Sequence, residues 1–135
     1  MEKFLPLVNR EYCCKIWIRD ILYIEQTGRT VNIVTENKTF YDYNKIKNLE
    51  LYLDEYFVHC LKGTVVNFDQ IESMKDQCII FKNGTKYLLG RQSFVHTKQT
   101  FVFYMKNTEL FLERRRKKIH SKFECMPEDE KNKQA

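Results

Sequence analysis

The chain has 135 residues, of which 43% are apolar and 14% aromatic, and its 23 lysines and arginines against 18 acidic residues give a formal net charge of +5. This composition can supply a packed core, and it excludes a wholly disordered or collagen-like chain. No apolar run approaches the roughly 20 residues of a membrane span, and the first residues lack the apolar core of a secretory signal. We therefore expect a cytoplasmic protein with one compact, moderately basic domain.

Most of the chain is expected to form a β-sheet domain, because short runs rich in β-branched and aromatic residues alternate with turn signals. In chain order, the predicted strands are residues 12–18, 21–25, 30–35, 39–43, 64–67, 71–75, 78–81 and 85–88. The Asn83-Gly84 pair between the last two strands predicts a type I′ hairpin turn, in which both central residues have positive φ.

Two segments have the periodicity of helices instead. Apolar residues at i, i+3 and i+7 predict a short helix over about residues 45–55, with Asn44 as its cap. A longer helix is predicted from Ser93, a good N-cap, through an apolar stripe that ends near residue 112. The expected fold class is therefore mainly β, a compact sheet domain with one short internal helix and a longer C-terminal helix.

The expected organisation has three parts: a leader over residues 1–11, the domain over 12–106, and an extension over 107–135 that ends in a charged, disordered tail. The extension contains a run of five cations, which are Arg114, Arg115, Arg116, Lys117 and Lys118. Two interpretations of this run stay open. It is either a solvated helix end, where cations favour the helix dipole, or a contact for phosphate groups.

Patterns typical of catalysis or metal binding are missing from the sequence. Its five cysteines form no Cys-x-x-Cys pair, and an odd number of cysteines without a secretory signal is typical of free thiols. The serines lie in no Gly-x-Ser-x-Gly elbow, and four scattered glycines cannot build a phosphate loop. His59 and Cys60 are neighbours on a strand, so we expect an exposed His59 and a buried Cys60 rather than a catalytic pair. We therefore expect no enzyme, no metal and no cofactor.

Three sequence blocks resemble the LytTR DNA-binding domain family, in the family's order. Residues 20–25, with the sequence DILYIE, are similar to the family's opening signature. Residues 57–67 resemble its F-x-R-x-H-R-S-x-x-V-N element. Residues 83–84 (NG) and 88–91 (LLGR) resemble its n-G…l-x-x-S-R hairpin. Because the resemblance extends over about residues 12–106, it covers most of the chain.

The resemblance implies a bacterial transcription regulator that binds double-stranded DNA without a recognition helix. Loops between strands would then reach into successive major grooves and the intervening minor groove. Carried over by position, the first loop gives Arg29, Thr30, Val31 and Asn32, the second gives Lys62 and Gly63, and the third gives Arg91 and Gln92. Lys86 is expected on the same face of the domain, and no small-molecule substrate is expected.

The individual contacts have alternatives. Arg91, which the family pattern retains, can make a bidentate contact to guanine or a salt bridge that closes the sheet onto the terminal helix. Lys62 keeps a positive charge but lacks the planar fork of arginine, which favours phosphate contact over base reading. For Arg29 and Asn32, a solvated loop is nearly as good an interpretation. Asn67 is expected to satisfy backbone groups at a strand end.

Several positions depart from the family pattern. Family members usually carry Arg at the position of His59, His at that of Leu61, and Ser at those of Gly63 and Gly90. The loss of these polar side chains motivates a second hypothesis. In it, the chain is a protein-interaction module that retains the LytTR fold with weakened DNA specificity.

The eleven residues before the first predicted strand leave no room for the phosphorylated receiver domain of many LytTR proteins. The chain is therefore expected to resemble free-standing LytTR regulators, some of which are controlled by a membrane-bound inhibitor protein. The aromatic-rich helix over residues 94–111 offers a surface for a homodimer or for such an inhibitor, or it packs against its own sheet, which we expect for its first three turns. Residues 108–118 are the better candidate for an added contact, since they exceed what the family domain requires.

Overall fold

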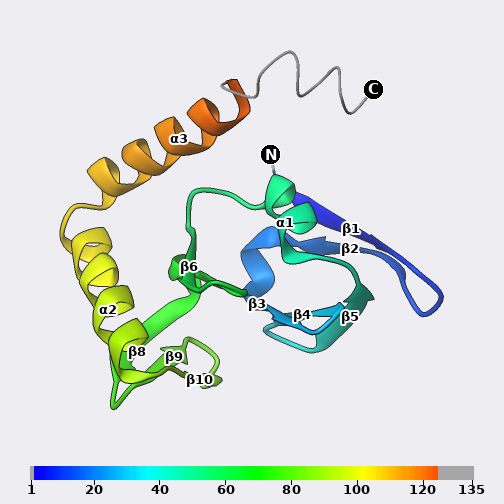
Figure 1. The fold of residues 1–135 in the computed structure, drawn as a ribbon, viewed down its shortest axis with the longest axis horizontal. Coiled ribbons are helices and arrows are strands. Elements are labelled where there is room, and N and C mark those ends of the chain that lie inside the picture. Colours follow the sequence, from blue (N-terminus) through cyan, green and yellow to red (C-terminus); the bar gives the residue numbers. More distant parts are fainter. Residues whose placement is uncertain (1, 125–135) are drawn as a thin grey trace.

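A computed structural model describes residues 2–124 of the chain, and the side chains of residues 2–119 (Figure 1). Its strands are β1 (Phe4–Val8), β2 (Cys13–Trp17), β3 (Ile21–Thr27), β4 (Thr30–Thr35), β5 (Thr39–Tyr43), β6 (Phe57–Leu61), β7 (Thr64–Asn67), β8 (Ile71–Lys75), β9 (Cys78–Phe81) and β10 (Lys86–Leu88). Its helices are α1 (Ile46–Leu49), α2 (Arg91–Lys106) and α3 (Thr108–Glu124), with 3-10 turns η1 (Ile18–Asp20), η2 (Glu50–Tyr52) and η3 (Phe68–Gln70). The mainly β fold class is confirmed. The predicted disordered tail lies largely outside the described residues, and none of the described helices has the length and apolar character of a membrane span.

β3 lies at the centre of a five-stranded antiparallel sheet with strand order β5-β4-β3-β7-β6. Glu25 on β3 is paired with Asn32 on β4 and with Thr64 on β7. The other strands form two smaller antiparallel sheets, β1-β2 and β10-β9-β8. In Figure 1, the β1-β2 hairpin lies on one side of the large sheet, and β8–β10 lie with α2 on the other.

Each face of the large sheet is buried in its own apolar cluster. The first core cluster consists of Leu5, Leu7, Ile16, Ile18, Ile21, Ile24, Val31, Ile33, Leu49, Phe57 and Val65. The second core cluster consists of Leu22, Cys60, Val66, Phe68, Ile71, Ile79, Phe81, Leu89, Phe101, Phe111 and Leu112. The first cluster joins the sheet to β1 and β2, and the second joins it to β8, β9, α2 and α3. β3 contributes side chains to both clusters.

A bulge in β3 allows this burial on both faces. The pairing of β3 with β4 shifts between Ile21 and Tyr23, so Leu22 is an extra residue in the strand. An extra residue lets two neighbours face the same side of a sheet. Leu22 and Tyr23 accordingly both pack into the second core cluster, whereas Ile21 and Ile24 pack into the first.

The first residues form a strand rather than the expected leader. β1 pairs with β2 in an antiparallel hairpin. Leu5 and Leu7 are 0% and 1% exposed, while Pro6 between them faces solvent. Alternation with period two buries every second side chain of a strand, and an edge strand tolerates proline. Residues before position 12 therefore contribute to the apolar core.

The long helix is interrupted, and it begins earlier than predicted. Gly90 occupies the N-cap position and α2 begins at Arg91, so Ser93 lies inside the helix and does not cap it. α2 ends at Lys106 because Asn107 adopts φ −136° and ψ 50°, outside the helical region. The short internal helix is also divided, into the α-helical turn α1 and the 3-10 turn η2.

The break at Asn107 lets α3 pack back onto the domain. Phe111 and Leu112 are each 4% exposed and belong to the second core cluster. The ring of Phe111 stacks on that of Phe68, with 5.7 Å between centroids, and meets Tyr104 edge-on at 5.2 Å. The apolar core therefore continues past residue 106, where the domain was expected to end.

The β9–β10 hairpin forms as predicted, but with a different turn. Gly84 has φ +90°, whereas Asn83 does not have positive φ, so the turn is not type I′. The Gly84 N–H donates to the carbonyl oxygen of Phe81, and the loop has three residues, as in a type I turn followed by a left-handed glycine. Asn83 keeps a negative φ, and its side chain accepts a hydrogen bond from the Thr85 N–H at 3.0 Å.

The expected role of Asn67 is confirmed. This side chain is 2% exposed, donates to the carbonyl oxygen of Ile21 at 2.9 Å, and accepts from the Asp69 N–H at 3.0 Å. A buried amide that satisfies two backbone groups stabilises a strand end, and an unpaired buried carbonyl is costly.

We predict that Asn67→Ala lowers the free energy of unfolding by about 1–3 kcal/mol, because it leaves the buried carbonyl of Ile21 without its donor. Urea denaturation measures the change. The matched control is Asn37→Ala, in the exposed β4–β5 turn, which should unfold at the wild-type midpoint. Equal midpoints for the two variants would contradict the assignment.

Candidate functional site

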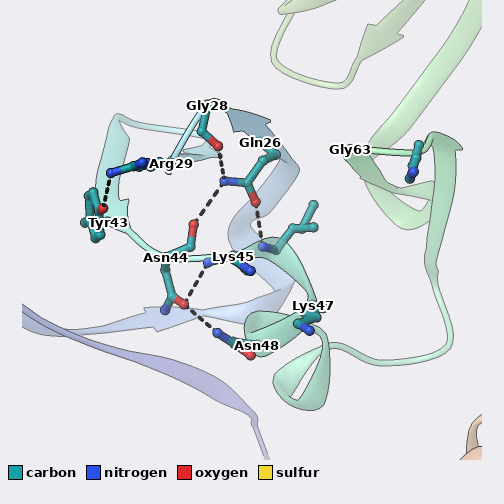
Figure 2. A pocket seen from close by; sticks show the side chains of 11 residues that line it. Gln26, Gly28, Arg29, Tyr43, Asn44, Lys45, Lys47, Asn48 and Gly63 are labelled. Atoms are coloured by element: carbon teal, nitrogen blue, oxygen red, sulfur yellow. Dashed lines mark hydrogen bonds between the residues drawn. The ribbon is translucent and has the colours of Figure 1, made fainter.

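Three segments meet at one end of the large sheet and enclose an open pocket, called the loop pocket below (Figure 2). They are the β3–β4 turn at Gly28 and Arg29, residues 44–48 after β5, and the β6–β7 turn at Lys62 and Gly63. Antiparallel pairing of β5 with β4, of β4 with β3 and of β3 with β7 brings these segments to the same end of the sheet.

The side chain of Gln26, the next-to-last residue of β3, connects two of these segments. Its amide nitrogen donates to the carbonyl oxygens of Gly28, Thr30 and Asn44 at 3.0, 3.3 and 3.0 Å. Its amide oxygen accepts a hydrogen bond from the Ile46 N–H at 2.7 Å. Figure 2 shows Gln26 between the β3–β4 turn and the segment after β5. One side chain therefore forms hydrogen bonds with four backbone groups.

The β6–β7 turn lies directly on β3. The Gln26 N–H donates to the carbonyl oxygen of Gly63 at 2.8 Å. A Cβ at position 63 would lie 3.4 Å from the Cβ of Gln26, an ordinary van der Waals contact. The hydrogen bond between Gln26 and Gly63 holds the β6–β7 turn, which carries Lys62, beside the pocket end of β3.

The loop pocket carries uncompensated positive charge. Its charged lining residues are Arg29, Lys45, Lys47 and Lys62, and no Asp or Glu lines it. All four cations are exposed, and within residues 2–119 none of them forms an ion pair. The Arg29 guanidinium lies 3.4 Å from the hydroxyl of Tyr43. Clustered cations without acidic partners create a positive potential that attracts anions.

The first predicted loop is shorter than expected. Gly28 and Arg29 form the turn, and Thr30, Val31 and Asn32 belong to strand β4. Val31 is 0% exposed in the first core cluster and cannot contact a ligand. Thr30 and Asn32 point to the opposite face because side chains alternate along a strand, and both are half-buried there.

The third predicted contact region lies outside the loop pocket. Arg91 and Gln92 are the first two residues of α2, Lys86 is the first residue of β10, and all three are exposed. The salt bridge considered for Arg91 is absent from residues 2–119. The guanidinium is therefore available to a ligand.

Two hydrogen bonds orient β10 relative to the loop pocket. Asn83 donates to the carbonyl oxygen of Glu36 at 3.1 Å, which places the β9–β10 turn beside the β4–β5 turn. That turn lies at the end of the large sheet opposite to the loop pocket. Tyr87 donates to Glu25 near the pocket end of β3. From Asn83 to Tyr87 the chain thus runs toward the end that carries the loop pocket, and Arg91 follows.

Tyr87 ties β10 to the large sheet. Its hydroxyl donates to Oε2 of Glu25 at 2.6 Å and lies 3.1 Å from the hydroxyl of Thr64. Its ring centroid is 4.7 Å from that of Tyr23. Burial, together with the hydrogen bond to the Glu25 carboxylate, raises the pKa of Tyr87, so the hydroxyl stays a donor at neutral pH. This network holds β10 against the strands that carry the β6–β7 turn.

Several cations of the run in α3 contact the domain itself. The Arg114 guanidinium lies 5.2 Å from the ring centre of Phe103, and Nε of Arg116 lies 3.2 Å from a carboxylate oxygen of Glu55. Because both arginines have partners within the chain, the run is not simply a solvated helix end.

Arg115 makes the shortest contact with the domain among the arginines of the run. It donates to the carbonyl oxygen of Phe57 on β6 at 2.6 Å, and burial lowers its pKa. Lys117 forms an exposed i,i+4 pair with Glu113, and Lys118 is exposed. Phosphate contact by the run stays a prediction, with these two lysines as its most accessible members.

The neighbouring His59 and Cys60 do not form a catalytic pair. Cys60 is buried and His59 is exposed on the other face of β6, where its ring contacts the carboxylate of Glu50. Burial raises the pKa of the Cys60 thiol to about 12, which keeps it protonated and unreactive. Within residues 2–119 no group of three or more His, Cys, Asp or Glu is placed to hold a metal ion.

The residues of the loop pocket that sequence reasoning missed include Gln26, Lys45 and Lys47. The region after β5 was interpreted as the start of a helix capped by Asn44. The predicted cap is wrong, because Lys45 occupies the N-cap position of α1 and no side chain caps the helix. The side chain of Asn44 instead accepts hydrogen bonds from the Lys45 N–H and from the side chain of Asn48, at 2.8 and 2.9 Å. No local sequence pattern indicates that this segment lies against two turns that are distant in the sequence, because the pairing of strands in the sheet brings them together.

Comparisons with known proteins match this fold. The sequence model of the LytTr DNA-binding domain matches residues 11–102. A solved LytTr DNA-binding domain from Bacillus cereus superimposes with a TM-score of 0.60 and 15% sequence identity, over 76% of this chain and 98% of that chain. A comparison with curated proteins found no match. The residues matched by the sequence model include both turns of the loop pocket and the first turn of α2.

We predict that Gln26→Ala destabilises the loop pocket, because four backbone groups lose their partner. The amide of Ile46 should exchange its hydrogen faster, and the free energy of unfolding should fall by about 1–3 kcal/mol. Hydrogen exchange followed by NMR measures the first effect and urea denaturation the second. Gln99→Ala, exposed on α2, is the control. Unchanged protection of Ile46 in the Gln26 variant would show that Gln26 does not hold this segment.

Proposed function

Because the chain belongs to the LytTr DNA-binding domain family, we propose that it is a transcription regulator that binds a specific sequence of double-stranded DNA. The binding surface consists of the loop pocket and the exposed start of α2. In this proposal the turns between strands and the first residues of α2 make the contacts, and no helix lies in a groove as a recognition element. A regulator of this kind is proposed to act in the cytoplasm.

The unpaired positive charge of the loop pocket is the observation that supports this proposal best. Arg29 and Lys62 come from turns far apart in the sequence and line one pocket that has no carboxylate. A DNA duplex presents one phosphate charge for about every 1.7 Å of its axis, and protein cations that neutralise these charges release counterions. A surface with converging, unpaired cations is therefore well suited to a duplex.

We assign different roles to the arginine on α2 and to the cations of the pocket. Arg91 is exposed and unpaired within residues 2–119, and its planar guanidinium can hydrogen bond to O6 and N7 of one guanine. Lys62 is a point charge on a flexible stem and suits phosphate, as does Arg29 at the other turn. We propose as further candidates for base or phosphate contact Thr30, Asn32, Gly63, Lys86 and Gln92.

Selection of binding sites from a random duplex DNA pool tests the proposal directly. The purified protein, at about physiological salt, should enrich a defined motif, and a repeat spaced by about one helical turn would indicate two bound copies. Background binding that depends on salt but enriches no motif would contradict sequence-specific binding.

We predict that Arg91→Ala weakens binding to the selected site by about 1–3 kcal/mol and relaxes the preference at one base position. Lys82→Ala is the matched control, because Lys82 is an exposed cation in the β9–β10 turn, at the opposite end of the sheet. Fluorescence anisotropy with the selected duplex and its single-base variants measures both effects. Unaltered affinity and base preference would remove Arg91 from the interface.

We predict a different signature for Lys62→Ala. Specific and non-specific duplexes should lose affinity together, and the slope of log K against log salt should become less steep by about one unit, as for one lost phosphate contact. Titrations of the same two duplexes at several salt concentrations measure the slope, with Lys82→Ala again as control. A loss confined to the specific duplex would instead assign Lys62 to base reading.

A protein-interaction module is the second candidate function. Leu61 and Leu88 are 38% and 71% exposed, and glycines stand at positions 63 and 90, where the family usually carries serine. Exposed apolar side chains favour contact with protein. A second copy of the chain and a membrane-bound inhibitor are the partners proposed for this reading. Enrichment of a protein partner without any DNA motif would favour it.

A further inference from the structure

The segment after β5 places two cations in the loop pocket that the family resemblance does not assign. Lys45 and Lys47 lie on either side of Ile46, whose side chain packs against the first core cluster. The two lysines are exposed, and they share the pocket with Arg29 and Lys62. Three separate segments thus contribute positive charge to one hollow.

Acidic residues close in sequence to the pocket cations have other partners. Glu50, three residues after Lys47, contacts the ring of His59. The carboxylate of Asp42 accepts hydrogen bonds from the side-chain amides of Asn9 and Asn44, at 3.1 and 3.2 Å. The carboxylate of Glu25 accepts the hydroxyl of Tyr87. Within residues 2–119 neither Asp42 nor Glu25 forms an ion pair with a pocket cation. The charge of the pocket is therefore left for an external anion.

The backbone beneath the two lysines is held in place before any ligand binds. The Ile46 N–H donates to Gln26, and the side chain of Asn44 accepts from the Lys45 N–H and from Asn48. Figure 2 shows these bonds on the wall of the pocket that faces the β3–β4 turn. A preorganised segment loses less conformational entropy on binding, so each contact contributes more to affinity.

We propose that Lys45 and Lys47 bind backbone phosphates of DNA, so that the segment after β5 is a fourth contact region beside the two turns and the start of α2. This inference rests on the proposed function. Phosphate is the ligand because a lysine ammonium is a compact point charge without the planar fork that reads a base. The segment fixes affinity and register on the duplex and adds no base preference.

The experiment compares DNA binding by the full chain and by the double variant K45Q/K47Q, using the duplex selected by the wild type and a scrambled duplex. Each is titrated between about 0.1 and 1 M salt. The matched control is K82Q/K106Q, which removes the same charge from two exposed lysines, one in the β9–β10 turn and one in the last turn of α2. Thermal unfolding checks that both variants fold.

The salt slope of K45Q/K47Q should be less steep than that of the wild type by about two units, because each phosphate contact contributes about 0.9 to the slope. Affinity for both duplexes should fall by roughly thirtyfold near 0.15 M salt and approach the wild-type value near 1 M. The motif selected from a random pool should stay the same. The control variant should keep most of the wild-type slope.

Two results would overturn the proposal. If the wild type selects a motif and K45Q/K47Q keeps its slope, the lysines do not touch the duplex, although the proposed function stands. If inorganic phosphate stabilises the wild type but not K45Q/K47Q, while both keep the same DNA slope, the pocket takes free phosphate instead. A wild type that binds no DNA would contradict the proposed function itself, which the first titration reveals separately.

Discussion

β3 is the strand on which the rest of the structure depends, because it is paired along both edges and buried on both faces. Its neighbours are β4 and β7, and its side chains enter both core clusters. A slip of one residue would exchange the faces of all its side chains. The bulge at Leu22 sets the register, since it turns Leu22 and Tyr23 to the same side while Ile24 returns to the other.

The same alternation positions the proposed binding surface at the end of β3. Glu25 faces the side of the second core cluster and holds Tyr87, and with it β10 and the start of α2. Gln26 faces the other side and holds the β3–β4 turn and the segment after β5. Two consecutive residues of one strand therefore position two of the proposed contact regions, and the sheet fixes the position of one region relative to the other.

Local patterns were sufficient for most strands and for the family, which the match over residues 11–102 confirms. They were insufficient where contacts between distant parts of the chain determine the local structure. The apolar stripe of the terminal helix continues through Asn107, so periodicity does not reveal that the helix breaks there to return Phe111 to the core. Lys45 and Lys47 were missed for the same reason, because their neighbours in the pocket lie on distant turns that only the sheet pairing brings together.

The distribution of charge shows why a run of consecutive cations indicates an anion-binding surface less well than cations that the fold brings together. Consecutive arginines lie on different faces of a helix, and in α3 Arg115 is bound to the carbonyl of Phe57 and Arg116 to Glu55. The cations of the loop pocket are separated in the sequence by polar and apolar residues, yet three antiparallel pairings bring them to one end of the sheet without acidic partners. The anion-attracting surface is therefore a product of topology, and a change that loosened β3 would disperse it without removing a single charge.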